Sequence, residues 1–343
     1  MKSYIIISNG SGGIATFQKY FIKNVLRVKD RVYLIDKKNN HTLKYFKKKE
    51  KKLINTYYCN PTFDLLKVFY YLNLIKKKHS KERLIFLFSN PLLLVLYFFF
   101  IKLKLSSSKI YLFIHSHILK MSMSQILINI FSSLISPFIN KIYFVSNFTK
   151  SWWLKYFFFY NFSNNQVCYN SVKLPKILKY KNKANRIGFV GRLEKEKGID
   201  VFSNIMKYMI KYNFQFQIFG KGSYKEKIFK HKSITVNNWE TQNKIYKKID
   251  ILLQTSPIEN CSIAVLEAKS YGIPTLSISK GGTCEIVKNN INGIVLKKNT
   301  DFKIIKNSLF KIKKNIKKFR KNCIKDRYNF NEKVCFLKML NKM

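Results

Sequence analysis

Short apolar runs alternate along this chain with longer segments in which apolar residues recur every three or four positions. That alternation is typical of β-strands that are each followed by an α-helix. In the first half, the runs that predict strands are residues 3–8, 31–36, 83–88, 109–117 and 141–146. Because these runs are almost continuously apolar, they predict a parallel sheet with helices on both faces.

A polar, lysine-rich link at residues 169–186 separates this half from a second one with the same alternation. The second half predicts strands at 186–191, 214–220, 233–238, 250–256 and 274–279, and helices at 198–212, 241–249 and 262–272. The predicted fold class is therefore α/β, with two doubly wound, Rossmann-like domains at residues 1–170 and 171–325. A last helix at 326–343 is expected to pack back toward the N-terminal domain.

One apolar stretch, residues 84–105, is nearly as long as a membrane span. Ser89, Asn90 and Pro91 interrupt it, so that a continuous run of about 18 apolar residues is absent. We therefore expect a buried strand, a turn, and a helix with Pro91 in its first turn.

Charge narrows the choice of partners. The chain has 65 Lys and Arg against 17 Asp and Glu, a net charge of +48. The lysines are scattered, and we ascribe part of the excess to a compositional bias; the rest favours a polyanionic partner. No helix-turn-helix, finger or aromatic RNA platform is recognisable, so an anionic membrane surface is expected rather than nucleic acid. An aromatic helix at residues 149–162 could contact the membrane, or equally belong to the core or lie between domains.

The cysteines and the N-terminus bear on location. Six cysteines occur singly, without metal-ligand spacing, which indicates a reducing compartment. The first apolar run is too short for a signal peptide. We expect a cytoplasmic protein, peripheral on the inner face of the cytoplasmic membrane, with no obligate protein partner.

Two candidate sites follow strands of the first half. The glycine-rich loop after the first strand includes Gly12 and Gly13, where the backbone and a helix start could approach a phosphate. A tight strand-to-helix turn would need the same glycines. His115 and His117 end another strand, but no Cys, Asp or Glu stands near to complete a metal shell. We expect His115 to contact substrate instead.

The stretch "RIGFVGRLEKEKGID" places Arg192 and Lys197 just after a strand that ends in Gly191. Two cations at a strand end suit a diphosphate, which Arg can bind through a bidentate fork. Residues 194–196 are expected to be a solvated charged loop. The chain contains no Asp-x-Asp, so we expect no metal cofactor.

The stretch "SPIENCSIAVLEAKSYGIP" holds two of the few carboxylates, Glu259 and Glu267, around a short apolar helix. Ser262 can cap that helix or contact a ligand. A carboxylate accepts two hydroxyl hydrogens at once, which suits vicinal diols. The helix dipole would explain an acid at Glu259, but not at Glu267.

These two stretches resemble the family 4 glycosyltransferases of the GT-B fold, whose hallmark is Glu-x7-Glu. The resemblance implies two domains facing a cleft, and transfer from a nucleotide sugar with retention of configuration. It implies that Glu259 contacts the donor sugar and Glu267 the nucleotide ribose, so Glu267 is expected to face the cleft rather than the core. "GGTCEIVKNNINGIVL" resembles the glycine loop of the family, whereas "VCYNSV" departs from it, with Ser171 where a glycine is usual.

The sequence thus predicts a hexosyltransferase acting on a lipid-linked or lipopolysaccharide-type saccharide in bacterial O-antigen or capsule synthesis. No carboxylate at a strand end of the first half suggests itself as a nucleophile. Alternatives are a sugar-nucleotide epimerase of the same architecture and a basic nucleic-acid-binding protein. The catalytic candidates are Glu259, Arg192, Lys197 and His115. The donor-binding candidates are Gly12, Gly13, Arg192, Lys197, Glu259, Glu267 and Ser262.

Overall fold

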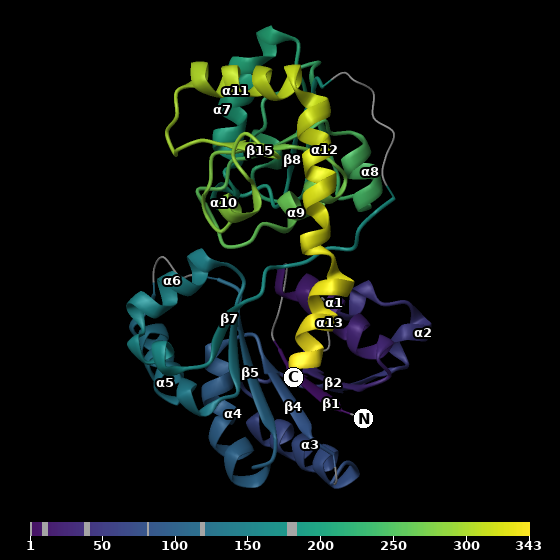
Figure 1. The fold of residues 1–343 in the computed structure, drawn as a ribbon, viewed down its shortest axis with the longest axis vertical. Coiled ribbons are helices and arrows are strands. Elements are labelled where there is room, and N and C mark those ends of the chain that lie inside the picture. Colours follow the sequence, from purple (N-terminus) through teal and green to yellow (C-terminus); the bar gives the residue numbers. More distant parts are fainter. Residues whose placement is uncertain (1, 9–12, 38–41, 81, 117–120, 177–183) are drawn as a thin grey trace. The chain divides into compact units, whose positions relative to one another are not determined.

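The computed structural model describes residues 2–8, 13–37, 42–80, 82–116, 121–176 and 184–343. It divides the chain into two compact units (Figure 1). Unit 1 comprises Met1–Tyr169 and Lys333–Met343, and unit 2 comprises Asn170–Glu332. Each unit has a parallel sheet, so the predicted α/β class with two such sheets is confirmed.

Within the described residues, the sheet of unit 1 has seven strands in the order β3-β2-β1-β4-β5-β6-β7. The strand order reverses between β1 and β4, and in such sheets ligands bind beyond the carboxyl ends at this point. The strands are β1 Ser3–Ile7, β2 Arg31–Asp36, β3 Ile54–Tyr58, β4 Leu84–Phe88, β5 Lys109–Ile114, β6 Lys141–Phe144 and β7 Asn165–Val167.

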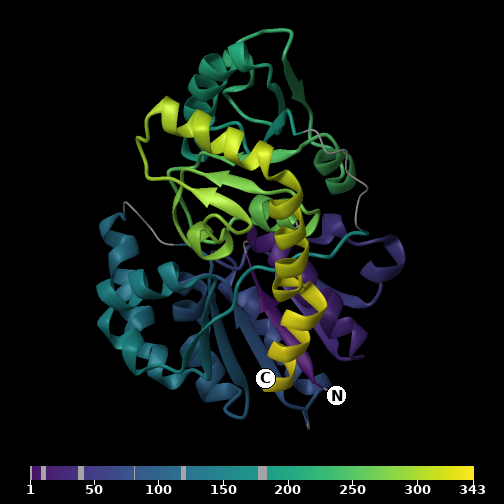
Figure 2. The same ribbon diagram turned by 45° about the horizontal axis from the view of Figure 1, so that its top comes forward.

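Helices cover both faces of this sheet (Figure 1). One face carries α1 Gly13–Arg27 and α13 Glu332–Lys342, which lie side by side (Figure 2). Phe336 of α13 packs on Phe17 of α1, with ring centroids 5.1 Å apart. The opposite face carries α3 Leu65–Lys78, α4 Pro91–Lys104, α5 Met123–Ile135 and α6 Asn147–Tyr156. Shorter helical segments are η1 Leu43–Tyr45, α2 Lys48–Lys51, η2 Ser136–Phe138 and η3 Phe158–Phe162.

The described part of unit 2 has a six-stranded sheet in the order β10-β9-β8-β11-β13-β15, beside a short pair formed by β12 and β14. Its strands are β8 Arg186–Val190, β9 Gln215–Phe219, β10 Ile234–Asn237, β11 Ile251–Gln254, β12 Ile258–Glu259, β13 Thr275–Ser277, β14 Lys280–Gly281 and β15 Gly293–Val295. Its helices are α7 Ile199–Met209, α8 Gln242–Lys247, α9 Ile263–Ser270, α10 Thr283–Ile286, α11 Phe302–Lys314 and α12 Ile316–Asp326, with short turns η4 Lys195–Lys197, η5 Ile210–Tyr212, η6 Lys225–Lys227 and η7 Arg327–Phe330.

The long apolar stretch of unit 1 forms a strand, a turn and a helix, as predicted. Strand β4 is fully buried, and α4 begins at Pro91 after Asn90, whose side chain accepts a hydrogen bond from the amide of Leu92 at 2.8 Å. Among the described residues, no helix is both long and apolar enough to cross a membrane.

The aromatic segment at residues 149–162 is not one helix, so that prediction was wrong. Helix α6 ends at Tyr156, because Phe157 has an extended ψ of 86°, and the 3-10 segment η3 follows. The side chain of Asn161 donates to the carbonyls of Leu154 at 3.1 Å and Phe158 at 2.8 Å, which satisfies acceptors at the helix end. The break sends some aromatic rings into the core and leaves others exposed.

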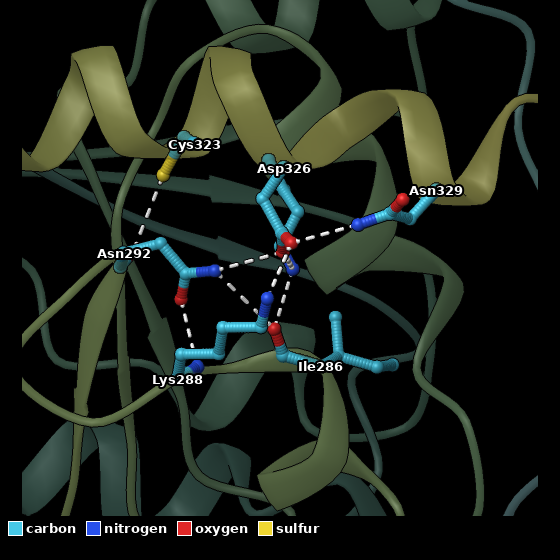
Figure 3. Close-up of polar contacts among 7 residues, drawn as sticks. Ile286, Lys288, Asn292, Cys323, Asp326 and Asn329 are labelled. Carbon is cyan, nitrogen blue, oxygen red and sulfur yellow. Dashed lines mark hydrogen bonds and ion pairs between the residues drawn. The ribbon is translucent and has the colours of Figure 1, made fainter.

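A buried ion cluster holds the helices of unit 2 together (Figure 3). Asp326, at the end of α12, accepts from Lys269 of α9 at 2.5 Å and from Lys288 at 2.7 Å. Asn292 and Asn329 donate to the same carboxylate at 3.1 and 3.0 Å. Burial alone would raise the pKa of Asp326, but the two lysines outweigh it and hold that pKa below its usual range. Both carboxylate oxygens of Asp326 therefore accept hydrogen bonds from cationic or amide donors.

Removing Asp326 should destabilise unit 2 strongly, because Lys269 is only 3% exposed and would keep an unpaired charge. We expect Asp326→Ala to lower the free energy of unfolding by about 3–5 kcal/mol in urea denaturation followed by circular dichroism. Adding Lys269→Met should recover at least half of that loss. A double variant as unstable as Asp326→Ala would show that packing, not the buried charge, sets the effect.

Candidate functional site

The loop after β8 presents Arg192 as an exposed cation. Arg192 follows Gly191 and pairs with Glu196 at 2.8 Å, both side chains being more than half exposed. Glu194 points elsewhere: it accepts hydrogen bonds from the hydroxyl and amide of Ser223 at 2.6 and 2.8 Å, which lower its pKa. The expected solvated loop is thus partly wrong, since Glu194 holds the neighbouring loop after β9.

The second cation, Lys197, is positioned by a close backbone contact. Gly198 follows it with φ +71°, and a Cβ there would lie 2.1 Å from the carbonyl oxygen of Thr255. The Thr255 hydroxyl donates to the Gly198 carbonyl at 2.7 Å, and the Ser256 hydroxyl donates to the Lys197 carbonyl at 3.2 Å. Only glycine fits this approach, and it seats the turn η4 on the end of β11.

Lys197 and Glu259, which are 62 positions apart, meet as an ion pair at 2.7 Å. Gln254 donates to the same carboxylate oxygen at 3.4 Å and to the hydroxyl of Ser256 at 2.8 Å. The backbone of Glu259 is fixed by the β12–β14 pair and accepts from the amide of Gly282 at 2.8 Å. The structure therefore brings two of the predicted site residues together at the carboxyl end of the sheet.

Glu267 lies inside α9 and is only 7% exposed. It accepts a hydrogen bond from the hydroxyl of Tyr246 at 2.9 Å and another from the side chain of Gln242, both in α8. The expectation that Glu267 faces solvent is wrong, because α8 covers it. Burial, with the charge of Glu267 beside it, raises the pKa of Tyr246 well above its usual value. Ser262 is at the N-cap of α9, but its side chain makes no capping hydrogen bond.

In unit 1, His115 follows β5 and packs edge-on against Phe17, with ring centroids 4.9 Å apart. Neither ring nitrogen finds a hydrogen-bond partner among the described residues. Burial lowers the pKa of His115 to about 4, so the ring is neutral at physiological pH. Gly13 begins α1, whereas Gly12 and His117 lie outside the described residues.

Sequence reasoning missed Asp36, a carboxyl group at the carboxyl end of β2. Its side chain is 3% exposed, and burial raises its pKa to about 7 although the amide of Lys37 donates to it at 2.6 Å. The signal was an apolar strand ending in an acid, "RVYLID".

A second missed group lies at the switch point between β1 and β4. Gln18 of α1 donates to the hydroxyls of Ser8 at 2.6 Å and Ser89 at 3.2 Å, and accepts from Thr42 at 2.8 Å. These side chains follow different strands or belong to different elements, so no short sequence motif connects them. They make the strand ends of unit 1 polar and well ordered.

Whether the described residues could bind a metal ion depends on which side chains lie close together. No group of three or more His, Cys, Asp or Glu side chains in those residues could hold a metal ion. The charged groups at the strand ends of unit 2 include Arg192, Lys197 and Glu259.

Residues 171–330 match the model of the family described as glycosyl transferases group 1, which covers nearly all of unit 2. This segment of the chain belongs to that family. It is 34% identical over 125 residues to an uncharacterized glycosyltransferase of Methanocaldococcus jannaschii, covering 33% of this chain and 32% of that protein. An uncharacterized 41.2 kDa protein from the cps region of Klebsiella pneumoniae is 28% identical over 148 residues, covering 38% and 41%. The chain thus spans less than half of these curated relatives.

Solved structures resemble the whole chain, including the residues before the segment that matches the family. Anabaena HepE in complex with UDP matches with a TM-score of 0.78 at 12% identity, covering 100% of this chain and 99% of that one. The lipopolysaccharide outer core galactosyltransferase WaaB, in its apo form, matches with a TM-score of 0.71 at 18% identity, covering 99% and 98%. These likenesses confirm the predicted GT-B fold.

The departure at Ser171 leaves the local backbone unstrained. Ser171 is not among the residues with positive φ, so this position does not require glycine. The backbone N–H of the neighbouring Asn170 donates to the sulfur of Cys261 at 3.3 Å. The side-chain amide of Asn170 donates to the Cys261 carbonyl at 3.0 Å. These contacts fix the loop that leads into α9.

Asp36→Asn should stabilise the protein in a pH-dependent way. Burial raises the pKa of Asp36 from its ordinary value of 3.8 to about 7 in the folded state. The stability that its protonated form contributes is therefore complete below pH 3.8 and is lost as pH rises through 7. We expect the Asn variant to gain roughly 2–3 kcal/mol more at pH 8 than at pH 5. Thermal unfolding across this range measures it, and a pH-independent difference would contradict it.

Proposed function

We propose that this protein is a retaining glycosyltransferase that moves a sugar from a nucleotide-sugar donor to a lipid-linked or lipopolysaccharide-type saccharide. The observation that carries the proposal is the Lys197–Glu259 pair, held on the loops after β8 and β11. Glu267 follows in the next helix, within the segment that matches the family. A cation beside a carboxylate suits a ligand that joins a diphosphate to a sugar.

Arg192 and Lys197 have different tasks in this proposal. Arg192 is 64% exposed, and its pairing with Glu196 is a surface contact that a diphosphate can replace at little cost. Lys197 is more enclosed and already contacts Glu259. It would therefore meet the diphosphate next to the carboxylate that accepts the sugar hydroxyls. Both cations stabilise the negative charge that develops as the nucleotide leaves.

Glu267 would bind the ribose while also supporting the fold. A carboxylate accepts hydroxyl hydrogens, two at once from a vicinal diol, which is the chemistry that a ribose offers. The protein donors Gln242 and Tyr246 fix the orientation of the carboxylate before the nucleotide arrives, which lowers the cost of binding. His115, neutral at physiological pH, would contact the acceptor by donating or accepting one hydrogen bond.

The acceptor is proposed to be membrane-borne and part of a bacterial surface polysaccharide. Supporting it, one similar structure is a lipopolysaccharide galactosyltransferase and one similar sequence comes from a capsule region. The net charge of +48 favours peripheral attachment to an anionic membrane, placed on its cytoplasmic side. A panel of nucleotide sugars read by thermal shift tests the donor: one present at 100 times its Kd should add about 2.7 kcal/mol. If no member of the panel stabilises the protein, the proposal fails.

Glu267→Gln should weaken binding of the donor found in that panel at least tenfold, because a neutral amide accepts fewer hydroxyl hydrogens. Calorimetric titration measures it. Glutamine is preferred to alanine because it keeps the volume beside Tyr246, whereas alanine would also unfix α8. Glu240→Gln, which loses an ion pair with Lys248 in the same unit, is the matched control and should bind normally. A Glu267→Gln protein that melts earlier but binds the donor unchanged would make the residue purely structural.

Transfer should survive EDTA. The chain lacks Asp-x-Asp, and Arg192 and Lys197 supply positive charge where the diphosphate is proposed to bind. We expect the initial rate to change less than twofold after dialysis against EDTA, while Lys197→Met lowers it at least a hundredfold. Loss of activity on chelation, restored by Mg²⁺ or Mn²⁺, would refute this prediction.

A further inference from the structure

Helix α5 of unit 1 is amphipathic, but its polar side is buried and its apolar side is exposed. Its buried side chains are polar: Asn129, Ser132 and Ser133. A surface helix normally turns its apolar stripe inward. Here the exposed side is apolar, with exposed fractions from 40% to 72%, and consists of Met123, Leu127, Ile130, Phe131 and Leu134.

Hydrogen bonds fix this orientation. The hydroxyl of Ser132 bonds with the hydroxyl of Tyr160, which is fully buried, at 2.8 Å. Ser136, one residue past α5, donates to the carbonyl of Phe159 at 3.3 Å. Asn129 donates to the sulfur of Met121 at 3.3 Å. Turning α5 over would bury its apolar side only by breaking these bonds, so the exposure is built into the fold.

The apolar surface continues onto the segments that contact α5. Segments η2 and η3 pack on each other and on α5. Their exposed aromatic side chains are Phe138, Phe158, Phe159 and Phe162. We call these four residues, together with the five exposed residues of α5, the α5 face. Exposed apolar side chains gathered on segments that contact one another mark a site of interaction on a soluble protein.

The charge around the α5 face selects the partner. No Asp or Glu occurs between Glu82 and Glu194, so the sequence that carries the face contributes only positive charge. Lys150 and Lys155 lie in the neighbouring α6, and the latter is exposed. A second copy of this chain would bring two such cationic surfaces together, each belonging to a protein of charge +48. An anionic bilayer offers both an apolar interior and the opposite charge.

We propose that the α5 face inserts into the interface of an anionic bilayer. Helix α5 lies in the plane of the membrane, its apolar residues below the headgroups, and nearby lysines contact lipid phosphates. No helix of the described residues could span the membrane, so attachment is peripheral and reversible. This inference deepens the membrane partner named in the proposed function and rests on it for the acceptor. It places the contact on α5, η2 and η3 rather than on the full aromatic segment at residues 149–162.

Sedimentation of the full chain with vesicles tests the contact. The vesicles are phosphatidylcholine with or without about 30% phosphatidylglycerol. Low and high salt are compared, because the Debye length falls from about 30 Å at 0.01 M to about 3 Å at 1 M ionic strength. We expect Ile130→Gln with Phe131→Gln to lower partitioning onto anionic vesicles at least tenfold. The matched control is Phe63→Gln with Leu66→Gln, two residues that are 80% and 83% exposed but lie outside the α5 face. It should bind within twofold of the unaltered protein.

Substitutions of lysine measure how much the positive charge contributes to partitioning onto anionic vesicles. Lys150→Gln and Lys155→Gln should each lower partitioning about fivefold, which corresponds to about 1 kcal/mol per charge at an anionic surface. Equal losses in the α5 variant and in the control would overturn the proposal, as would binding of the α5 variant at the level of the unaltered protein. A dimer in sedimentation velocity that Ile130→Gln with Phe131→Gln dissolves would assign the face to a second copy and also overturn it.

Measuring nucleotide-sugar binding in solution distinguishes a failure of the membrane proposal from a failure of the proposed function. The α5 variant should show the same thermal shift with a nucleotide sugar as the unaltered protein, because its substitutions are on α5, which contains none of the donor-binding candidates. Loss of membrane partitioning with donor binding intact supports the α5 face. Absence of donor binding in every variant would refute the transferase proposal, while the vesicle result would still decide the membrane contact.

Discussion

The buried pair of Lys269 and Asp326 fixes the helix on which the candidate site of unit 2 depends. Lys269 and Glu267 are two positions apart in α9, which separates their directions by about 200° around the helix axis. Lys269 reaches α12 through Asp326, and Glu267 reaches α8 through Tyr246. The short helix is therefore held from two sides by buried charged groups. A buried charge without its partner is costly, so losing either contact would destabilise the position of α9.

This arrangement gives Glu267 two tasks that a single substitution to alanine would confuse. The carboxylate anchors Gln242 and Tyr246, and it is also the group proposed to accept the ribose hydroxyls. Glu259 differs, because its partner Lys197 is 31% exposed and is itself proposed to meet the ligand. One carboxylate is thus oriented by the fold and the other by a cation of the site. A neutral isostere at each position separates these contributions better than truncation does.

Much of the fold could be predicted from the sequence. Parallel strands that are buried on both faces appear as short apolar runs, which can be recognised without knowing which strands lie next to each other. Arg192 and Lys197 could be found for a similar reason, since they follow a recognisable strand. Glu259 and Glu267 were singled out by the resemblance to the Glu-x7-Glu family. The burial of Glu267 could not be predicted, because it depends on α8, a helix more than twenty residues earlier.

Helix α5 shows the same limit of sequence reasoning. Its polar residues Asn129, Ser132 and Ser133 form a stripe at helical spacing, and its apolar residues form another. Periodicity predicts both stripes but assumes that the apolar one faces inward. The partner that reverses the choice is Tyr160, which the break after α6 places in the core. Asp36 was missed for a related reason, since a carboxyl group at a strand end gains meaning only when its burial is known.

The few acids of the chain explain why its positive charge remains available. Asp250 accepts from Arg186 at 2.9 Å and Arg320 at 3.1 Å, and Asp326 pairs with Lys269 and Lys288. Three of these four cations are buried or half-buried, and only Lys288 is exposed, so the two carboxylates do little to neutralise the exposed lysines. The excess charge therefore resides on the surface, where a bilayer can reach it. In unit 1, Lys150 and Lys155 belong to α6, the α-helix that follows α5 in sequence. Attraction to lipid headgroups can then bring the α5 face to the depth at which burial of its side chains adds to binding.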